Sequence, residues 1–383
     1  MPHRPRPAPP LAHVKPSRQP ISLNSSRTEV VGIKPWKRWQ IDRFLRESYG
    51  KLHYAASPDE ALRNQARHGG RIVIWAAREP EGFAQAASRQ QAPLIRIEDG
   101  FLRSVGLGST HVGGASLVVD AEGIYFDPRT PSALERLLQA GGFSDALLQR
   151  AVVLRLFLVE HELTKYNVGT QKPLSMGGPA DRRKILVPGQ VENDASIRLG
   201  APEVRDNLHL LQQVRAAEPG AWIVYKPHPD TEVGTRPGRI PDSEVLRYAD
   251  QIVRGVSSAA LFPYVDAVHT MTSLLGFEAL LRDIPVTVWG MPFYAGWGLT
   301  QDRLHQSRRT RRLSIDELVA GALILYPVYA DPLTGQSCEV EQVAERLVQR
   351  SAAGSTTDRW AAQRIARLCL GLYRSWMSIY AGH

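Results

Sequence analysis

The chain has 383 residues, of which 43% are hydrophobic and 22% are charged, and its formal net charge is +9. Because domains typically hold about 100–200 residues, this length predicts two domains. No uninterrupted apolar run reaches the about 18–20 residues of a membrane-spanning helix, which argues against such a span and favours a globular protein. The positive net charge favours an anionic partner.

Residues 1–28 differ in composition from the rest of the chain. They carry five Lys or Arg, seven prolines and no acid, so we expect a disordered basic arm. Two interpretations of the arm stay open: a solvating tail, or a tether to anionic lipid headgroups. The two cysteines, Cys338 and Cys369, have neither a pairing nor a metal-ligand spacing, which favours a reducing cytoplasm and predicts no metal site.

Beyond the arm, apolar strands alternate with helical patterns, which is typical of parallel sheets. In chain order we expect a helical stretch from Trp36, strands at 71–76 and 94–97, a hairpin of 116–120 and 123–127, and a helix from Pro131 with Ser132 as N-cap. A loop at 171–180 is the best linker, and further strands follow at 184–188, 221–226, 267–270 and 284–289. Residues 355–383 have apolar side chains near helical spacing, which predicts a terminal amphipathic helix.

These elements predict an α/β protein with two Rossmann-like domains that face each other across a cleft, as in GT-B folds. The N-terminal domain is expected at 29–175 and the C-terminal domain at 181–345. Ligands of such folds bind at the carboxyl ends of the strands, where four polar clusters occur in this sequence.

The first cluster is Glu98-Asp99-Gly100, where an apolar strand ends. Two adjacent carboxylates are costly beside low-dielectric walls unless something pairs or uses them. A solvated turn, whose acids pair with Arg96 and Arg103, is the simpler interpretation, and a catalytic turn is the alternative.

The other three clusters follow strands of the second half. Lys226-Pro227-His228-Pro229 holds an imidazole between two prolines, which suits phosphate binding or protonation of a leaving group, although a lone His is usually structural. Thr272 and Ser273 precede a helix that contains Glu278, so they are either ordinary caps or phosphate ligands. Gln190 and Asn193 suit recognition of a base or sugar, and a capped helix start at Asp194 or Ser196 explains that loop nearly as well.

The loop 290–300 is rich in Gly and aromatic residues. It suits a carbohydrate-facing lid and a packed structural turn equally well.

Several segments together resemble the bacterial capsule polysaccharide biosynthesis family, specifically its β-Kdo transferases. The matching segments are Glu98–Gly108, Thr164-Lys165-Tyr166-Asn167, Val187–Asp194, Lys226–Pro229, Thr270–Ser273 and Tyr294–Gly298. Such enzymes are similar to CMP-sialic acid transferases with two Rossmann-like domains. The best-known capsule member carries two such modules in tandem, whereas this chain has one.

The resemblance implies a role for each cluster. Asp99 is the catalytic acid, with Glu98 as a structural or pKa-tuning neighbour. His228 and Pro229 grip the CMP phosphate together with Thr272 and Ser273. The remaining assignments follow: Glu278, Gln190 and Asn193 hold the cytidine or ribose, and Arg103 and Lys226 supply charge for the Kdo carboxylate or phosphate.

The expected function is therefore a retaining transfer of Kdo from CMP-β-Kdo to a lipid acceptor, by way of an Asp99 nucleophile. The expected acceptor is a lipid-linked Kdo or a phosphatidylglycerol-type lipid, at the cytoplasmic side of the inner membrane, with no cofactor and no nucleic acid. Two alternatives stay open: an inverting CMP-sugar transferase with Asp99 as general base, and a non-catalytic basic module that binds lipid or nucleic acid.

Overall fold

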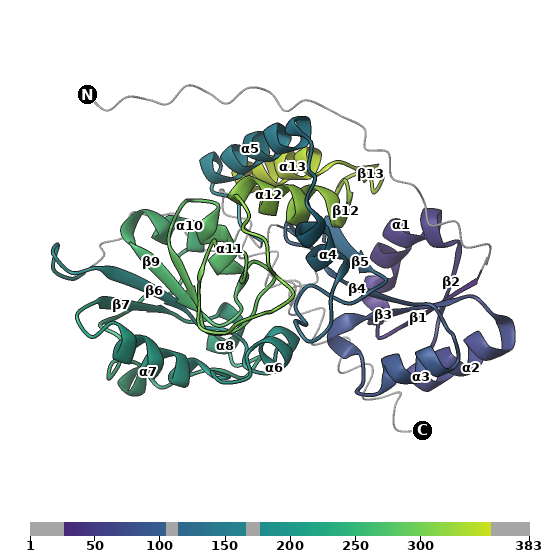
Figure 1. The fold of residues 1–383 in the computed structure, drawn as a ribbon, viewed down its shortest axis with the longest axis horizontal. Coiled ribbons are helices and arrows are strands. Elements are labelled where there is room, and N and C mark those ends of the chain that lie inside the picture. The colour runs from purple at the N-terminus through teal and green to yellow at the C-terminus, as the bar shows by residue number, and fades with distance from the viewer. Residues whose placement is uncertain (1–26, 105–113, 166–176, 354–383) are drawn as a thin grey trace.

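The computed structural model describes residues 27–104, 114–165 and 177–353, and Figure 1 shows them as two α/β bodies side by side. Each body is built on one sheet flanked by helices. The predicted fold class, two parallel-rich Rossmann-like domains, is confirmed. The predicted terminal helix at 355–383 and most of the arm lie outside the described residues.

The first sheet has seven strands in the order β13-β12-β5-β4-β3-β1-β2. They are β1 (Arg27–Val31), β2 (Lys51–Tyr54), β3 (Arg71–Trp75), β4 (Leu94–Asp99), β5 (Ser116–Asp120), β12 (Pro327–Ala330) and β13 (Ser337–Cys338). β1 to β4 pair in parallel, and β5, β12 and β13 extend the sheet antiparallel. β3 and β4 confirm the predicted strands, whereas β1 begins inside the segment predicted as a disordered arm.

The second sheet has six strands, all parallel, in the order β11-β10-β9-β6-β7-β8. They are β6 (Lys184–Pro188), β7 (Trp222–Lys226), β8 (Gln251–Ile252), β9 (Ala267–Thr270), β10 (Val286–Val288) and β11 (Gln301–Asp302). Strands buried on both faces read as continuous apolar runs, which is why four of them were predictable. The order reverses between β6 and β9, so the carboxyl ends of β6, β7 and β9 meet where such sheets bind ligands.

The described α-helices are α1 (Arg38–Tyr49), α2 (Pro58–His68), α3 (Phe83–Arg89), α4 (Ala133–Ala140), α5 (Asp145–Glu160), α6 (Ala195–Gly200), α7 (Asn207–Ala217), α8 (Pro229–Glu232), α9 (Asp242–Val245), α10 (Ser258–Leu261), α11 (Leu274–Leu280), α12 (Ile315–Val319) and α13 (Val340–Ala353). Most of them begin at a polar side chain that caps them, whereas α1, α3 and α9 have no side-chain cap. The Ser132 hydroxyl accepts the Glu135 N–H, as predicted, and Ser314 forms a capping box with Glu317.

The predicted hairpin of 116–120 and 123–127 is wrong. β5 pairs with β4 and β12 instead, and residues 123–127 form a turn. The cause is Asp120, whose Oδ1 accepts the N–H groups of Glu122 and Gly123 at 2.8 and 2.9 Å. Its Oδ2 accepts from the Ala133 N–H at 3.0 Å and the Tyr326 hydroxyl at 2.7 Å. A carboxylate with four donors holds the chain in a turn.

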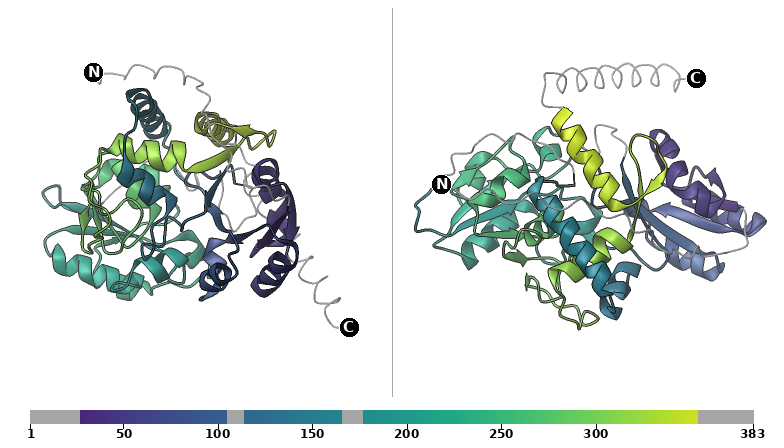
Figure 2. Two further views of the ribbon diagram at one scale, coloured as in Figure 1. Left: turned by 45° about the vertical axis from the view of Figure 1, so that its right-hand side comes forward. Right: turned by 90° about the horizontal axis from the view of Figure 1, so that it is seen from above.

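The predicted boundary of the second domain is also wrong. β12 and β13 lie inside the range 181–345, yet they belong to the first sheet. The chain therefore returns to the first body after the second sheet. Figure 2 shows the returning segment. Arg150 of α5 forms an ion pair with Glu341 of α13 at 2.7 Å.

One hydrophobic core joins the two bodies. It includes Phe101 and Val118 of the first body, Leu154 of α5, and Phe277 and Trp297 of the second. Smaller cores fill the second sheet's other face and both faces of the first sheet. The shared core holds the strand ends of both sheets in a defined relation.

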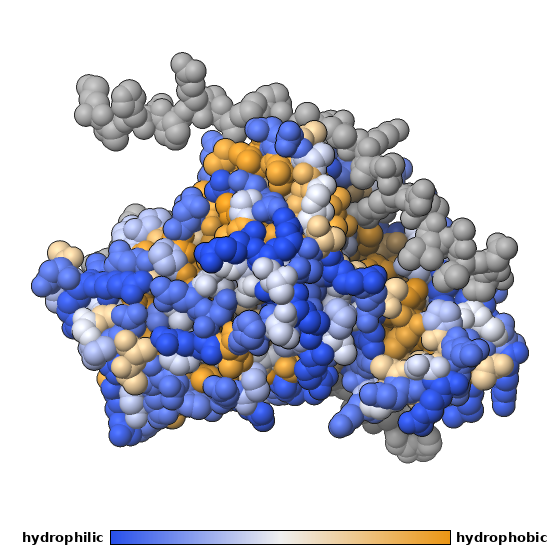
Figure 3. All heavy atoms as spheres, in the orientation of Figure 1, coloured by the Kyte–Doolittle hydropathy of each residue, from blue (hydrophilic) through white to orange (hydrophobic). Residues whose placement is uncertain are grey.

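Helix α5 is apolar around most of its circumference. Leu154 and Leu158 are buried in the core, whereas Leu156 points away and is 50% exposed. Figure 3 shows apolar residues gathered in this part of the surface. None of the helices within the described ranges is long and apolar enough to cross a membrane.

Candidate active site

The Glu98-Asp99-Gly100 turn ends β4 beside β5. The Gly100 N–H donates to the Ser116 carbonyl at 3.2 Å. A Cβ at position 100 would lie 2.3 Å from Ser116 Oγ, so only glycine fits here. The glycine therefore serves the close approach of two chains at the end of the strand.

Asp99 is an ionised carboxylate between two cations. Arg103 Nε lies 3.0 Å from Asp99 Oδ2, and Lys37 Nζ lies 3.3 Å from Oδ2 and 3.5 Å from Oδ1. Burial alone would raise the pKa of Asp99, but the charges of Arg103, Lys37 and Lys165 outweigh it and lower that pKa. The Asp99 side chain keeps 16% of its surface exposed, so it remains reachable.

Lys37 is a site residue that the sequence did not indicate. Its ammonium lies 4.0 Å from the centre of the Trp75 ring, at the end of β3, and its side chain is 20% exposed. The indole face attracts the cation, so Trp75 and Asp99 hold the ammonium together. Lys37 and Asp99 are 62 positions apart in the sequence, so their contact could not be predicted from their spacing.

Glu98 has the opposite electrostatic setting. Its carboxylate accepts the N–H groups of Ala77 and Asp99, both at 3.2 Å. Burial and the adjacent Asp99 charge raise the pKa of Glu98 to about 8. The two carboxyls therefore differ in charge near neutral pH. Arg96 pairs with Glu79 at 2.6 Å rather than with either of them, so the predicted Arg96 partner is wrong.

His228 begins α8 at the end of β7. Its Nδ1 accepts the Asp230 N–H at 3.1 Å, so in the neutral ring the proton sits on Nε2. Burial lowers the pKa of His228, and it also lowers the pKa of Lys226. Pro229 occupies the first position of α8, where its missing N–H costs nothing. The loop thus presents a neutral Nε2–H donor on a stiff backbone.

Thr272 and Ser273 lie between β9 and α11. The Ser273 hydroxyl accepts the Leu275 N–H at 3.2 Å, which is the predicted cap. The Tyr294 hydroxyl donates to the Ser273 carbonyl at 2.5 Å. A Cβ on Gly276 would lie 2.3 Å from that hydroxyl oxygen, so the close neighbour that Gly276 permits is Tyr294.

Gln190 is buried and its amide serves the protein itself. Its Oε1 accepts from the Thr270 hydroxyl and the Thr272 N–H, both at 3.1 Å, and its Nε2 donates to Thr272 Oγ1 at 3.0 Å. Gln190 therefore braces the Thr272 loop. Asn193 is peripheral by comparison, and its Oδ1 accepts from Arg236 at 3.1 Å.

Lys165 links the two halves of the site through its backbone. Its N–H donates to Glu278 Oε1 at 2.8 Å, and its carbonyl accepts the N–H groups of Arg103 and Ser104 at 3.3 Å. Glu278 is buried, and burial raises its pKa. The Asp99 turn is thus connected to α11, the helix that Ser273 begins. Of the segment Thr164-Lys165-Tyr166-Asn167, the last two residues lie outside the described ranges.

Aromatic packing brings the same two halves together. The ring of Phe101, two residues after Asp99, lies 4.6 Å from that of Phe293 and 6.4 Å from that of Phe277. In the loop 290–300, Tyr294 and Trp297 are fully buried, and Trp297 Nε1 donates to the Phe293 carbonyl at 2.9 Å. Of the two interpretations of this loop, the packed turn is confirmed and the lid is wrong.

The polar clusters of the sequence thus fall into two connected groups. The acid turn carries Glu98, Asp99 and Arg103. The second group, at strand ends of the second sheet, carries Lys226, His228, Pro229, Thr272, Ser273 and Glu278. Lys37 and Trp75 are additions from the structure. Lys165 already belongs to a segment of the family resemblance, and the structure adds its backbone hydrogen bonds to both groups. Within the described ranges, no three His, Cys, Asp or Glu side chains gather as metal ligands would.

Comparison with known proteins identifies relatives of the same architecture. A family model described as "Capsule polysaccharide biosynthesis protein" matches residues 70–175 and 171–336. The capsule polysaccharide modification protein LipA of Neisseria meningitidis is 45% identical over 321 residues, which is 84% of this chain and 45% of LipA. The lipopolysaccharide-processing protein LpsZ of Rhizobium meliloti is 41% identical, over 82% of this chain and 73% of LpsZ. This chain thus spans less than half of LipA.

Two solved structures of KpsC from Thermosulfurimonas dismutans share the fold. The one described as a beta Kdo 2,7 transferase is 36% identical, with a TM-score of 0.69. The match covers 85% of this chain and 99% of the KpsC chain. The one described as a beta Kdo 2,4 transferase is 31% identical, with a TM-score of 0.72, and covers 84% and 98%. With the family model matching well over half of its residues, the chain belongs to the capsule polysaccharide biosynthesis protein family.

Proposed function

We propose that the protein is a retaining glycosyltransferase that transfers Kdo from CMP-β-Kdo to a lipid-linked acceptor. The observation that carries the proposal is Asp99, a mostly buried but still accessible carboxylate that two cations keep ionised at the end of β4. Retention requires two successive displacements and a carboxylate nucleophile. The likeness to two KpsC structures described as β-Kdo transferases supports the sugar.

In the first step, Asp99 attacks the anomeric carbon and the bond to the CMP phosphate breaks. The Nε2–H of His228 and the hydroxyl of Ser273 donate to the departing phosphate, and Lys226 adds positive charge. Thr272 joins them when its hydroxyl turns away from Ser196 Oγ, to which it donates at 3.1 Å. In the second step, an acceptor hydroxyl attacks the same carbon, its proton passes to solvent water, and the bond to Asp99 breaks to release the free carboxylate. The two inversions give net retention.

The charge state of Asp99 favours this role over the inverting alternative. A general base works best when its pKa lies near the working pH, and the cations lower the pKa of Asp99 away from it. A nucleophile has the opposite need, because only the ionised carboxylate attacks. Lys37 and Arg103 supply that condition.

We place the acceptor at an anionic membrane surface, as a lipid-linked Kdo or a phosphatidylglycerol-type lipid. The net charge of +9 would draw the protein to such a surface, and the exposed Leu156 of α5 offers apolar contact beside it. Binding to vesicles with and without phosphatidylglycerol measures this part separately.

The decisive experiment incubates the protein with CMP-Kdo generated in situ and a Kdo-lipid mimic. Wild type is expected to form a β-linked product by NMR, and to gain the mass of one Kdo when the acceptor is withheld. Asp99→Asn is expected to lose both. An α-linked product would establish the inverting alternative, and absence of transfer and of CMP binding would leave the non-catalytic module.

A further inference from the structure

The segment Trp36-Lys37-Arg38-Trp39 has an inward-facing lysine between two exposed tryptophans. The Lys37 ammonium contacts the Trp75 ring and the Asp99 carboxylate. Trp36 and Trp39 are 41% and 53% exposed. Because indoles are large apolar groups that folded proteins mostly bury, two of them exposed beside the proposed nucleophile indicate a binding surface.

Each of these exposed rings has a cation over its face. The Lys34 ammonium lies 4.7 Å from the centre of the Trp36 ring, and the Arg43 guanidinium lies 5.4 Å from that of Trp39. A ring with a cation in contact presents an apolar body and a positive charge to the same partner.

Cations outnumber acids in this part of the chain. Residues 34–50 hold five Lys or Arg against two acids. Arg46, with 76% of its side chain exposed, reaches Asp42 at 3.4 Å. Lys34 and Arg43 have no acidic partner within the described ranges. The surface therefore keeps an excess of positive charge.

The turn between β12 and β13 continues this surface. Arg43 donates to the Asp331 carbonyl at 2.9 Å, and the N–H of Leu333, which is 62% exposed, donates to Asp331 Oδ1 at 2.7 Å. Figure 1 shows α1 and β13 along the edge of the molecule that α5 also occupies. We call this surface the tryptophan face, and its members are Trp36, Trp39, Leu333, Lys34, Arg43 and Arg46.

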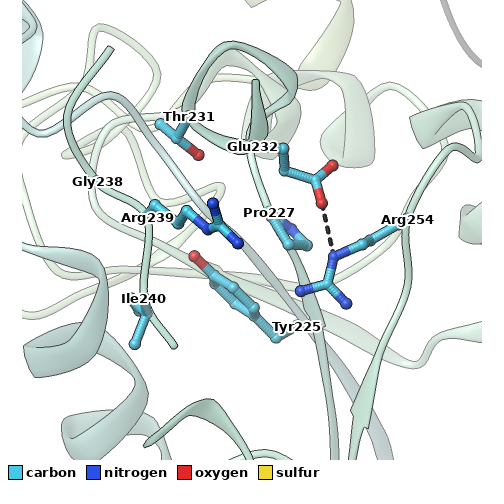
Figure 4. A pocket seen from close by; sticks show the side chains of 8 residues that line it. All are labelled: Tyr225, Pro227, Thr231, Glu232, Gly238, Arg239, Ile240 and Arg254. Carbon is cyan, nitrogen blue, oxygen red and sulfur yellow. Dashed lines mark hydrogen bonds and ion pairs between the residues drawn. The ribbon is translucent and has the colours of Figure 1, made fainter. Parts of the chain in front are cut away.

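The exposed Val233 of the second body has a different setting. Glu232, the residue before it, pairs with Arg254 at 2.6 Å (Figure 4), and Arg254 also pairs with Asp242 at 2.5 Å. These charges are neutralised within the protein. An apolar side chain beside them therefore lacks the excess of positive charge that the tryptophan face has.

We propose that the tryptophan face docks on an anionic lipid bilayer, with its indoles at the level of the headgroups and its cations on the lipid phosphates. Tryptophan is enriched at membrane interfaces, and Lys and Arg beside them are attracted to anionic lipid. A protein partner fits this face less well, because the cores of protein interfaces are depleted in lysine. Since Lys37 lies between the two indoles, docking brings Asp99 to the membrane surface. The inference rests on the proposed lipid-linked acceptor.

The test is co-sedimentation of the full chain with vesicles of phosphatidylcholine, alone or mixed with phosphatidylglycerol. Wild type should bind the mixed vesicles, and its tryptophan emission should then shift to shorter wavelength. Trp36→Ser combined with Trp39→Ser is expected to bind about tenfold more weakly, without that shift. Arg46→Gln is expected to lose about fivefold on the mixed vesicles, which is the attraction of one cation to an anionic surface.

The matched control is Leu246→Ser combined with Arg247→Gln. It removes an exposed apolar side chain and an exposed arginine from the second body, where Arg247 pairs with Glu244. This control should bind vesicles as wild type does. Thermal unfolding checks that every variant is folded.

Several outcomes would overturn the assignment. Vesicle binding that the tryptophan variant keeps would do so, and a loss in Leu156→Ser instead would move the contact to α5. Equal wild-type binding to both kinds of vesicle would exclude an anionic partner. A wild-type dimer that the tryptophan variant loses, without vesicle binding, would assign the face to a second copy of the chain.

Vesicle binding requires no sugar donor, so this test is separate from the test of the proposed function. If wild type binds the mixed vesicles but transfers no Kdo, the docking surface stands and the proposed function fails. If wild type transfers Kdo to a soluble acceptor mimic but binds no vesicles, the function stands and the docking surface fails.

Discussion

The ammonium of Lys37 lies 3.3 Å from the Asp99 carboxylate while it rests on the face of Trp75. The pair joins the segment before α1 to the end of β4, and it fixes the charge of the proposed nucleophile. Arg103 approaches the same carboxylate from the turn after β4 at 3.0 Å. Lys165 adds a third positive charge from the segment after α5, and Glu98 adds the neighbouring acid.

Replacing Lys37 by methionine is expected to move the acid limb of the kcat/KM profile to higher pH by about one unit. The reason is that Lys37 helps to lower the pKa of Asp99, so without it the carboxylate protonates at higher pH. Lys37→Arg should restore most of the profile. Lys34→Met is the control, because Lys34 lies over Trp36 at 4.7 Å and has no acidic partner within the described ranges. An unchanged limb in Lys37→Met would refute this role.

Replacing Glu98 by glutamine is expected to stabilise the protein more at pH 8 than at pH 5. Burial raises the pKa of Glu98 to about 8. Between the ordinary pKa of a glutamate and pH 8, the folded protein therefore keeps a proton on Glu98 that the unfolded chain has lost. Wild-type stability therefore falls as pH rises towards 8, and the variant lacks this loss. Urea unfolding at both pH values should show a gain of at least about 1 kcal/mol at pH 8. A gain that is equal at the two pH values would contradict the shift.

Replacing Glu278 distinguishes a linking residue from a ribose ligand. Glu278→Ala removes the acceptor of the Lys165 N–H and is expected to lower kcat by about tenfold or more, because small misplacements of reacting groups are costly. CMP affinity should stay within about twofold of wild type, since a factor of two is well under 1 kcal/mol. Glu278→Gln keeps an acceptor and should lose less. A large drop in CMP affinity in both variants would restore the ribose role.

Adding a methyl group at Gly276 is expected to destabilise the protein by about 2 kcal/mol. The new Cβ would meet the Tyr294 hydroxyl oxygen, which is bonded to the Ser273 carbonyl. Because Tyr294→Phe removes that oxygen, the double variant should recover part of the loss. Thermal unfolding of the two single variants and the double variant measures the coupling, and strict additivity would exclude the contact.

The second sheet and its polar strand ends were predictable because the relevant signals are local. β6 and β7 are short apolar runs, and Pro227 and Pro229 mark the end of β7 directly. Pairings between distant segments were not predictable in the same way. β1 reads as a mixed polar segment, and its place beside β3 depends on the whole sheet.

The candidate site shows the same division. Asp99, His228 and Ser273 stand out because each follows a strand, which local pattern reveals. Lys37 and Lys165 join the site only because the folded chain brings distant segments together. Lys37 contacts the Asp99 carboxylate, which lies 62 positions away, and Lys165 bonds to Glu278 through its backbone N–H. For Gln190 the local pattern was misleading. Its amide was predicted to hold the base or sugar, but it bonds with Thr270 and Thr272, which lie 80 and 82 positions further along the chain.

The return of the chain to the first sheet sets an order for synthesis. β5 exposes an unpaired edge until Pro327–Ala330 leaves the ribosome, by which time every strand of the second sheet has already emerged. The N-terminal body is therefore the last to be completed, although its residues are made first. A ribosome-bound chain that stops before β12 should expose Ser116–Asp120 to proteases, and a gene split between the two sheets should yield an aggregating N-terminal fragment.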